Sequence, residues 1–386
     1  MREVKKVSKG NKSQNNKKYY KNTPNTKSVV DTNTKSFKTV IKKITGFRLF
    51  LPLICLAIVL VINLIKTPSF FEITIKNGVL YGYIIDIINR SSELIILAVG
   101  MTLVVAASGG TDISVGAVSA LSGAVCVYAL VGGSSSDTYR IPYVVALFLA
   151  ALVGLACGAW NGFLVAKLKI QPMVATLILF TAGRGIAQVL TRGFILYVRK
   201  EQFKFLGNSI PGVPLPTPIF VAIAVVLITS FVLKKTAVGL YIQTVGINSK
   251  AARLVGLNSS RIKFLVYAFC GLCAGITGMI ITSRVYSIDA NNAGLNIELD
   301  AILAVAIGGN SLGGGKFSLL GSVIGAITIQ ALTTSLYAMK VTADQLPVYK
   351  AVVVVIIVAL QSPELKRMLK NLKNKAIARN TGKKVA

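Results

Sequence analysis

Long runs of apolar residues recur along this chain and constrain its fold more than any other feature. A helix needs about 20 apolar residues to cross the roughly 30 Å hydrocarbon core of a bilayer. Most of the runs approach that length, so the sequence predicts an all-α polytopic membrane protein with about ten transmembrane helices, including a short or broken one. The runs cover residues 47–65, 93–109, 113–131, 141–166, 173–192, 216–233, 263–283, 299–309, 317–337 and 346–361.

Positive charge lies almost entirely outside these runs. Of the 43 Lys and Arg residues, 14 lie in residues 1–48, six in 234–263 and eight in 362–386. Lys and Arg beside membrane spans stay cytoplasmic, so we expect cytoplasmic N- and C-termini and a cytoplasmic 234–262 loop. Counting the runs alternately from an inside N-terminus places all three segments on that side. The formal net charge of +30 then needs no nucleic-acid partner.

The charge pattern also divides the chain into parts. Residues 1–45 are rich in Lys, Asn, Ser and Thr, and cannot bury enough apolar surface to fold. We therefore predict a disordered basic cytoplasmic tail at 1–45, a transmembrane permease domain at 46–361 and a basic cytoplasmic tail at 362–386. No small-residue cleavage site follows the first run, so we expect that run to remain as the first span.

Nothing in the sequence predicts catalysis. The chain has no histidine, and its five cysteines all lie in apolar segments, where thiols behave as small apolar residues. A phosphate-loop interpretation of Lys316 fails, because Asn310 and Phe317 occupy positions that need Gly and Ser or Thr. We expect no enzymatic activity, no metal and no cofactor.

Two polar motifs interrupt the apolar pattern. Asp112 and Ser114, just before Gly116, join two runs with almost no loop, and we predict that they cap the following helix at the membrane surface. Glu298 and Asp300 open the short run that breaks at Gly308-Gly309. Glycine-broken helices place polar groups at transport pathways, but carboxylates at a helix start also complement its dipole. Both interpretations of this carboxylate pair stay open.

Isolated polar side chains lie inside other runs. Such residues are costly in lipid and usually line a cavity. With the carboxylate pair, three of them are predicted to line a translocation pathway: Asn161, Gln188 and Gln330. Trp160, Thr176 and Arg184 are further polar or amphipathic groups within the spans.

The cytoplasmic loop around residues 246–262 combines basic residues with small ones. Ala251, Ala252, Arg253 and Gly256 predict a short helix at the membrane surface, with Gly256 letting the chain turn back. On composition alone, a helix that only anchors the loop on lipid fits equally well.

Together these motifs resemble the permease subunits of bacterial monosaccharide ABC importers of the ribose/xylose/galactose type, over about residues 48–361. Residues 182–188 and 329–330 look more like the galactofuranose or galactoside branch. The segments that carry the resemblance are 98–102 and 111–116, the Ala-Ala-x-x-x-Gly core at 251–256, and 298–302 followed by 308–315.

The resemblance implies transport of a monosaccharide into the cytoplasm by alternating access, across the inner membrane of a bacterium. It also implies a cytoplasmic ABC ATPase that pushes on the 246–262 loop, a second permease subunit in a homo- or heterodimer, and an extracytoplasmic sugar-binding protein. Two alternatives stay open: a related ABC permease for branched-chain amino acids or nucleosides, and an ion-coupled secondary carrier.

Overall fold

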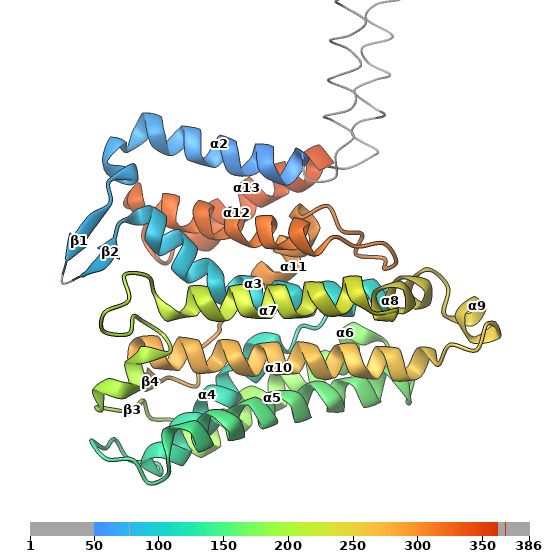
Figure 1. The fold of residues 1–386 in the computed structure, drawn as a ribbon, viewed down its shortest axis with the longest axis horizontal. Helices are drawn as coiled ribbons and strands as arrows, with labels where there is room; N and C mark the ends of the chain where they lie inside the picture. The colour runs from blue at the N-terminus through green and yellow to red at the C-terminus, as the bar shows by residue number, and fades with distance from the viewer. Residues whose placement is uncertain (1–49, 77, 362–366, 368–386) are drawn as a thin grey trace, which may run out of the picture. The chain divides into compact units, whose positions relative to one another are not determined.

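The fold comes from a computed structural model that describes residues 50–76, 78–361 and 367 (Figure 1). The predicted tail at 1–45, the first residues of the predicted permease domain and nearly all of the predicted tail at 362–386 lie outside this part of the chain. The structure therefore tests the membrane domain.

Each of the ten apolar runs forms a helix within the described residues. Six of the helices, α3, α5, α6, α7, α10 and α12, are long and apolar enough to cross a membrane by length and composition. The chain is mostly helical, as predicted, but only these six reach that standard. The bounds are α2 (Phe50–Lys66), α3 (Tyr83–Ser108), α4 (Val115–Val131), α5 (Tyr143–Ala166), α6 (Pro172–Thr191), α7 (Thr217–Lys235), α10 (Ser259–Val285), α11 (Ile297–Ile307), α12 (Leu319–Ala338) and α13 (Leu346–Gln361).

Two regions differ from the prediction. Helix α3 begins ten residues before residue 93, because Asp86, Asn89 and Arg90 hide its first turns from a hydropathy pattern. The surface helix expected at 246–262 is broken into the end of α8 (Val238–Ile247), a six-residue α9 (Ser249–Leu254) and the start of α10. The short elements outside the bundle are 3-10 helices η1 (Pro68–Phe71) and η2 (Glu201–Phe205), and strands β1 (Thr74–Lys76), β2 (Val79–Tyr81), β3 (Leu196–Tyr197) and β4 (Ser287–Ile288).

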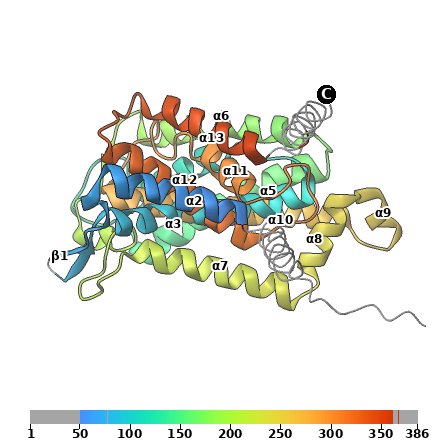
Figure 2. The ribbon, with the colours of Figure 1, turned by 90° about the horizontal axis from the view of Figure 1, so that it is seen from above.

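Helix α10 lies in the middle of the bundle, packed against α5, α3 and α4. Its contact with α5 is made by glycines spaced four residues apart, a spacing that lets helices approach closely: a Cβ added to Gly158 would lie 2.8 Å from the Cα of Gly271. On the other side of α3, α12 packs against α3, α2 and α11. Seen from above, α7 lies along one side of the bundle and α6 and α13 along the opposite side (Figure 2).

The connections fall into two groups at opposite ends of the bundle. Strands β1–β4 lie at one end, which we call the strand end, and α9 lies at the other, which we call the α9 end (Figure 1). At the strand end, β3 pairs with β4 in the register Leu196↔Ile288 and Tyr197↔Ser287. At the α9 end, Gly315 donates a backbone hydrogen bond to the carbonyl of Ala106 at 2.9 Å. The loops thus alternate between two ends, as the count of runs requires.

Candidate functional site

A short helix entered from the strand end forms the centre of the candidate site. After β4 the chain runs through residues 289–296 to α11, which has only 11 residues. At 1.5 Å per residue this is about 17 Å, roughly half of the hydrocarbon core. Asn296, with φ of 62°, sets the turn into the helix, and Gly309, with φ of 79°, follows its end. The predicted short helix broken at Gly308-Gly309 is confirmed.

Glu298 in the first turn of α11 is buried against the start of α4. Its side chain is 3% exposed, and its Oε2 has no hydrogen-bond partner among the described residues. Gly116 provides the space: a Cβ there would collide with Glu298 Oε2 and lie 2.5 Å from the carbonyl oxygen of Gly294. Burying an unpaired acceptor is costly, which makes Glu298 a candidate for contact with a ligand.

Helix α6 holds the segment that leads down to α11. Arg184 Nη1 donates to the backbone carbonyls of Asn291 at 2.7 Å, Ala290 at 3.1 Å and Ala293 at 3.3 Å. One turn further along α6, Gln188 Nε2 donates to Asn291 Oδ1 at 2.5 Å. Nε and Nη2 of Arg184 are buried and have no hydrogen-bond partner among the described residues. Gln188, Arg184 and Glu298 therefore belong to one polar region, which we call the α6–α11 site.

Asp289 fixes the strand-end start of this segment. Its Oδ1 accepts from the N–H of Asn291 at 2.9 Å, and its Oδ2 accepts from Asn292 Nδ2 at 2.7 Å. Partial burial raises the pKa of Asp289, but these hydrogen bonds, helped by the positive charge of Arg184, outweigh it and hold the pKa below its usual range. Asp289 is therefore a carboxylate at neutral pH.

Asp300 points away from Glu298. Two residues along an α-helix point about 200° apart, and Asp300 Oδ2 instead meets Lys350 Nζ of α13 at 2.6 Å. Gln330 on α12 donates to Thr334 Oγ1 of its own helix at 3.3 Å. Neither residue contributes a hydrogen bond to the α6–α11 site. Their role in a pathway stays a prediction.

The motif before α4 is a buried network, and the expected surface cap is wrong. Asp112 and Ser114 are each 1% exposed, and Asn161 is 0% exposed. Asp112 Oδ1 accepts from the Ser114 hydroxyl at 2.6 Å and from its N–H at 2.9 Å. Asn161 Nδ2 donates to Ser114 Oγ at 2.8 Å, and Ser114 makes no side-chain cap to α4. Burial denies these side chains water, so they hydrogen-bond to one another, although Asn161 Oδ1 has no hydrogen-bond partner among the described residues.

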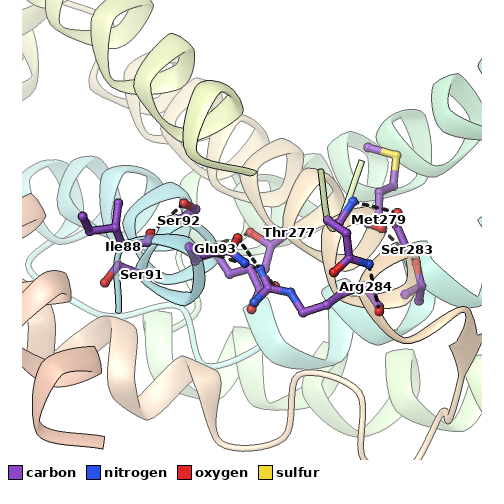
Figure 3. Close-up of polar contacts among 12 residues, drawn as sticks. Ile88, Ser91, Ser92, Glu93, Thr277, Met279, Ser283 and Arg284 are labelled. Atoms are coloured by element: carbon purple, nitrogen blue, oxygen red, sulfur yellow. Dashed lines mark hydrogen bonds and ion pairs between the residues drawn. The ribbon is translucent and has the colours of Figure 1, made fainter. Parts of the chain in front are cut away.

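One buried ion pair escaped the sequence analysis. Arg284 Nη2 of α10 lies 2.9 Å from Glu93 Oε1 of α3, with side chains 13% and 14% exposed (Figure 3). The same Nη2 is 3.3 Å from both the carbonyl and the Oδ1 of Asn89. In the sequence, Glu93 begins one apolar run and Arg284 follows the end of another. The alternating count places these two opposite charges on the same side of the membrane, and this was the signal that could have predicted the pair. The pair ties α3 to α10 near the strand end.

Helix α9 projects at the opposite end. Asn248 caps it: Oδ1 accepts from the N–H groups of Lys250 and Ala251, both at 3.0 Å. Ala252 is fully buried, whereas Leu254 is 89% and Val255 73% exposed. The side chain of Ala252 therefore faces the protein, and the role of Ala251, Ala252, Arg253 and Gly256 in coupling to an ATPase stays a prediction. Leu254 and Val255, which the sequence analysis overlooked, form the apolar tip.

Two further features of this loop bear on its shape. Gly256 adopts φ of 84°, which confirms the predicted turn. Arg253 turns back toward the start of α10, where its Nε donates to Ser259 Oγ at 2.7 Å and its Nη2 to Ser260 Oγ at 3.3 Å. Its guanidinium thus braces the turn.

Comparison with known proteins gives one consistent family. The family described as "Branched-chain amino acid transport system / permease component" matches residues 83–361. The galactofuranose transporter permease protein YtfT of Escherichia coli (strain K12) is 43% identical over 323 residues, covering 84% of this chain and 92% of that protein. No solved structure matches the chain.

Two other relatives are import permeases for sugars. The fructose import permease protein FruF of Bifidobacterium longum (strain NCC 2705) is 35% identical over 353 residues, covering 90% of this chain and 96% of that protein. The ribose import permease protein RbsC of Escherichia coli (strain K12) is 36% identical over 314 residues, covering 80% and 92%. The similarity extends along most of the membrane domain.

Proposed function

Because this chain belongs to the family described as branched-chain amino acid transport system / permease component, we propose that it is the membrane-spanning permease subunit of an ABC importer for a monosaccharide. The observation that carries the proposal is the similarity to galactofuranose, fructose and ribose permeases over at least 80% of this chain. The chain is a multi-pass membrane protein and a transport subunit rather than an enzyme. Its higher identity to the galactofuranose permease favours a galactose-type cargo.

The α6–α11 site is the proposed sugar pathway from the strand end. A sugar presents hydroxyl groups that both donate and accept hydrogen bonds. Glu298 Oε2 would accept one, and the free Nε and Nη2 of Arg184 would donate others. Gln188 lies one turn closer to the strand end on the same helix. Buried polar atoms of both kinds along one route are what a passing hydroxyl-rich cargo requires.

The α9 end is the proposed cytoplasmic end, and all ten apolar helices are proposed to insert in the membrane, with α11 as a half-helix. The Lys and Arg residues of the 234–263 loop support this assignment. The first residue of α2 and the last of α13 also lie toward this end (Figure 1). Both termini would then be cytoplasmic.

An impermeant thiol reagent tests this orientation in intact cells. Ile75→Cys on β1 and Leu254→Cys at the tip of α9 are matched, because both side chains are exposed, by 71% and 89%. We expect labelling at residue 75 and protection at residue 254 until the cells are permeabilised. Labelling of Leu254→Cys in intact cells contradicts the orientation.

The partners follow from this orientation. A cytoplasmic ABC ATPase would dock on the apolar tip formed by Leu254 and Val255, a sugar-binding protein would deliver cargo at the strand end, and a second permease subunit would complete the pathway. Leu254→Asp places a charge in the proposed contact, so sugar-stimulated ATP hydrolysis should fall strongly while the bundle stays folded. Ile75→Asp at the strand end is the matched control. Normal ATPase coupling in Leu254→Asp would reduce α9 to a membrane anchor.

Transport itself tests the cargo and the energy source. The permease is reconstituted in vesicles with its ATPase and binding protein, and uptake of labelled galactose, ribose, fructose and leucine is compared. We expect ATP-dependent uptake of a sugar and no uptake of leucine. Leucine uptake would favour the amino-acid alternative that the family description raises, and uptake driven by an ion gradient without ATP would favour a secondary carrier.

A further inference from the structure

A cationic cavity lies at the α9 end, between the α5–α6 connection and the start of α10. Its volume is about 360 Å³, and its lining includes Lys169, Lys250, Arg253 and Lys263. None of its lining residues, all of which the structure describes, is acidic. Four cations around one hollow repel each other, so the cavity is suited to an anion.

Three hydroxyl groups and the start of a helix lie at the same cavity, and Asn258 caps that helix by accepting from the N–H of Arg261. Ser108, Ser259 and Ser260 belong to its lining, and the last two form the first turn of the 27-residue α10. The N-terminus of a helix carries positive partial charge and favours anions such as phosphate. Arg253 donates to both of these serines, which holds its guanidinium at the cavity rather than toward a partner beyond α9.

An apolar groove continues from the cavity along the bundle surface. Its volume is about 320 Å³, and Phe163, Phe264 and Leu265 line it, with Lys167 and Arg261 also in the lining. Ser260 lines both the groove and the cavity. Phe163 is 42% and Leu265 63% exposed, so the groove opens outward on α5 and α10, two helices long and apolar enough to span a membrane.

We propose that the cavity and groove together bind an anionic phospholipid, with the phosphate of its headgroup among the four cations and an acyl chain along the Phe163–Leu265 groove. A free phosphate would use the cavity but not the groove. Basic pockets between membrane helices on the cytoplasmic side suit such headgroups. The bound lipid would lie next to α9, whose Lys250 and Arg253 line the cavity, and would hold the α5–α6 connection against α10.

The single tryptophan of the chain is a built-in reporter for this site. Trp160 on α5 packs on Phe163, with ring centroids 6.1 Å apart, and Phe163 lines the groove. Bromine atoms on a lipid chain seated in the groove would therefore quench Trp160 fluorescence. The full-length permease is reconstituted in vesicles of phosphatidylcholine with a minority of phosphatidylglycerol. In one set of vesicles the phosphatidylglycerol is brominated. In the other set an equal amount of the phosphatidylcholine is brominated instead.

We expect the brominated phosphatidylglycerol to quench Trp160 more than the brominated phosphatidylcholine, although charge and bromine content are the same. Neutralising the cavity in the double variant Lys169→Gln/Lys263→Gln should make the two vesicle sets equal. Lys234→Gln/Lys235→Gln, at the end of α7 and outside the cavity, is the matched control and should keep the difference. Unquenched emission in bromine-free vesicles verifies that each variant is folded.

Equal quenching of the unchanged protein by the two brominated lipids overturns the proposal, as does a difference that survives in Lys169→Gln/Lys263→Gln. Inorganic phosphate distinguishes a site for a lipid headgroup from a site for free phosphate. If the two brominated lipids quench the unchanged protein equally, and inorganic phosphate binds the unchanged protein but not Lys169→Gln/Lys263→Gln, the cavity is a site for free phosphate and the lipid assignment is wrong. If the difference in quenching persists when phosphate is added, the acyl chain contributes to binding.

Discussion

Asp112 and Glu298 look alike in sequence and differ in structure. Asp112 lies just before the start of α4, and Glu298 lies in the first turn of α11. Their side chains are 1% and 3% exposed. Asp112 accepts hydrogen bonds from Ser114 and Asn161, whereas Glu298 Oε2 has no partner among the described residues. The difference supports the proposal that the Asp112 carboxylate holds helices together, whereas Glu298 accepts a hydrogen bond from the cargo.

Removing the Asp112 carboxylate should have the largest effect, and the effect should be on stability. Asp112→Ala leaves the hydroxyl and the N–H of Ser114 without their acceptor, at about 1–3 kcal/mol for each buried group left unpaired. We expect a large drop in membrane yield and in the thermal unfolding temperature in detergent. Asp112→Asn retains an acceptor for Ser114 and is the control. An unfolding temperature in Asp112→Ala equal to that of the parent would contradict the structural role.

A methyl group at Gly116 should disturb the packing around Glu298. In Gly116→Ala the new Cβ collides with Glu298 and the Gly294 carbonyl, and overpacking costs about 1–3 kcal/mol. We expect moderate destabilisation together with loss of uptake. Gly185→Ala on α6 is the matched control, because nothing lies within 4 Å of its added Cβ. If both variants transport normally, the close packing of α4 on α11 is not required.

Breaking the Asp300–Lys350 ion pair should have the smallest effect. The side chains of Lys350 and Asp300 are 15% and 26% exposed, so neither is fully buried, and the pair should contribute about 1 kcal/mol at most. Asp300→Asn is expected to insert normally and to transport at near the parent rate. A loss of uptake as large as that caused by Gly116→Ala would place Asp300 in the pathway, as the sequence interpretation first had it.

The apolar runs of the sequence predicted most of the fold. All ten runs are helices, and the short one at 299–309 is the half-helix α11, because run length and hydropathy are local properties. The start of α3 at Tyr83 escaped prediction, since Asp86, Asn89 and Arg90 lower the hydropathy of its first turns. Asn89 and Glu93 of this helix contact Arg284 of α10, which lies nearly 200 residues further along the chain. Contacts between residues so far apart in the sequence depend on how the helices pack, and the hydropathy of neither segment reveals them.

The candidate site was predictable only in part. Polar residues in and beside the apolar runs singled out Asn161, Gln188 and Glu298, and their role in transport stays a prediction. Which of them act together depends on how α6 lies against residues 289–296, and no spacing along the chain encodes that. The same limit applies to α9, where Ala252 faces inward and Leu254 outward, although a six-residue helix has too short a pattern to tell the two faces apart.

Uptake by Glu298→Gln tests the central claim, that this buried carboxylate serves cargo rather than structure. The permease is assembled with its ATPase and binding protein in vesicles, and the rate of ATP-driven sugar uptake is divided by the amount of folded permease. Loss of one charged hydrogen bond to the cargo, about 1.5–3 kcal/mol, predicts a fall of at least about tenfold. The unfolding temperature should stay that of the parent. Full uptake, or an unfolding temperature lowered as in Asp112→Ala, would contradict the account.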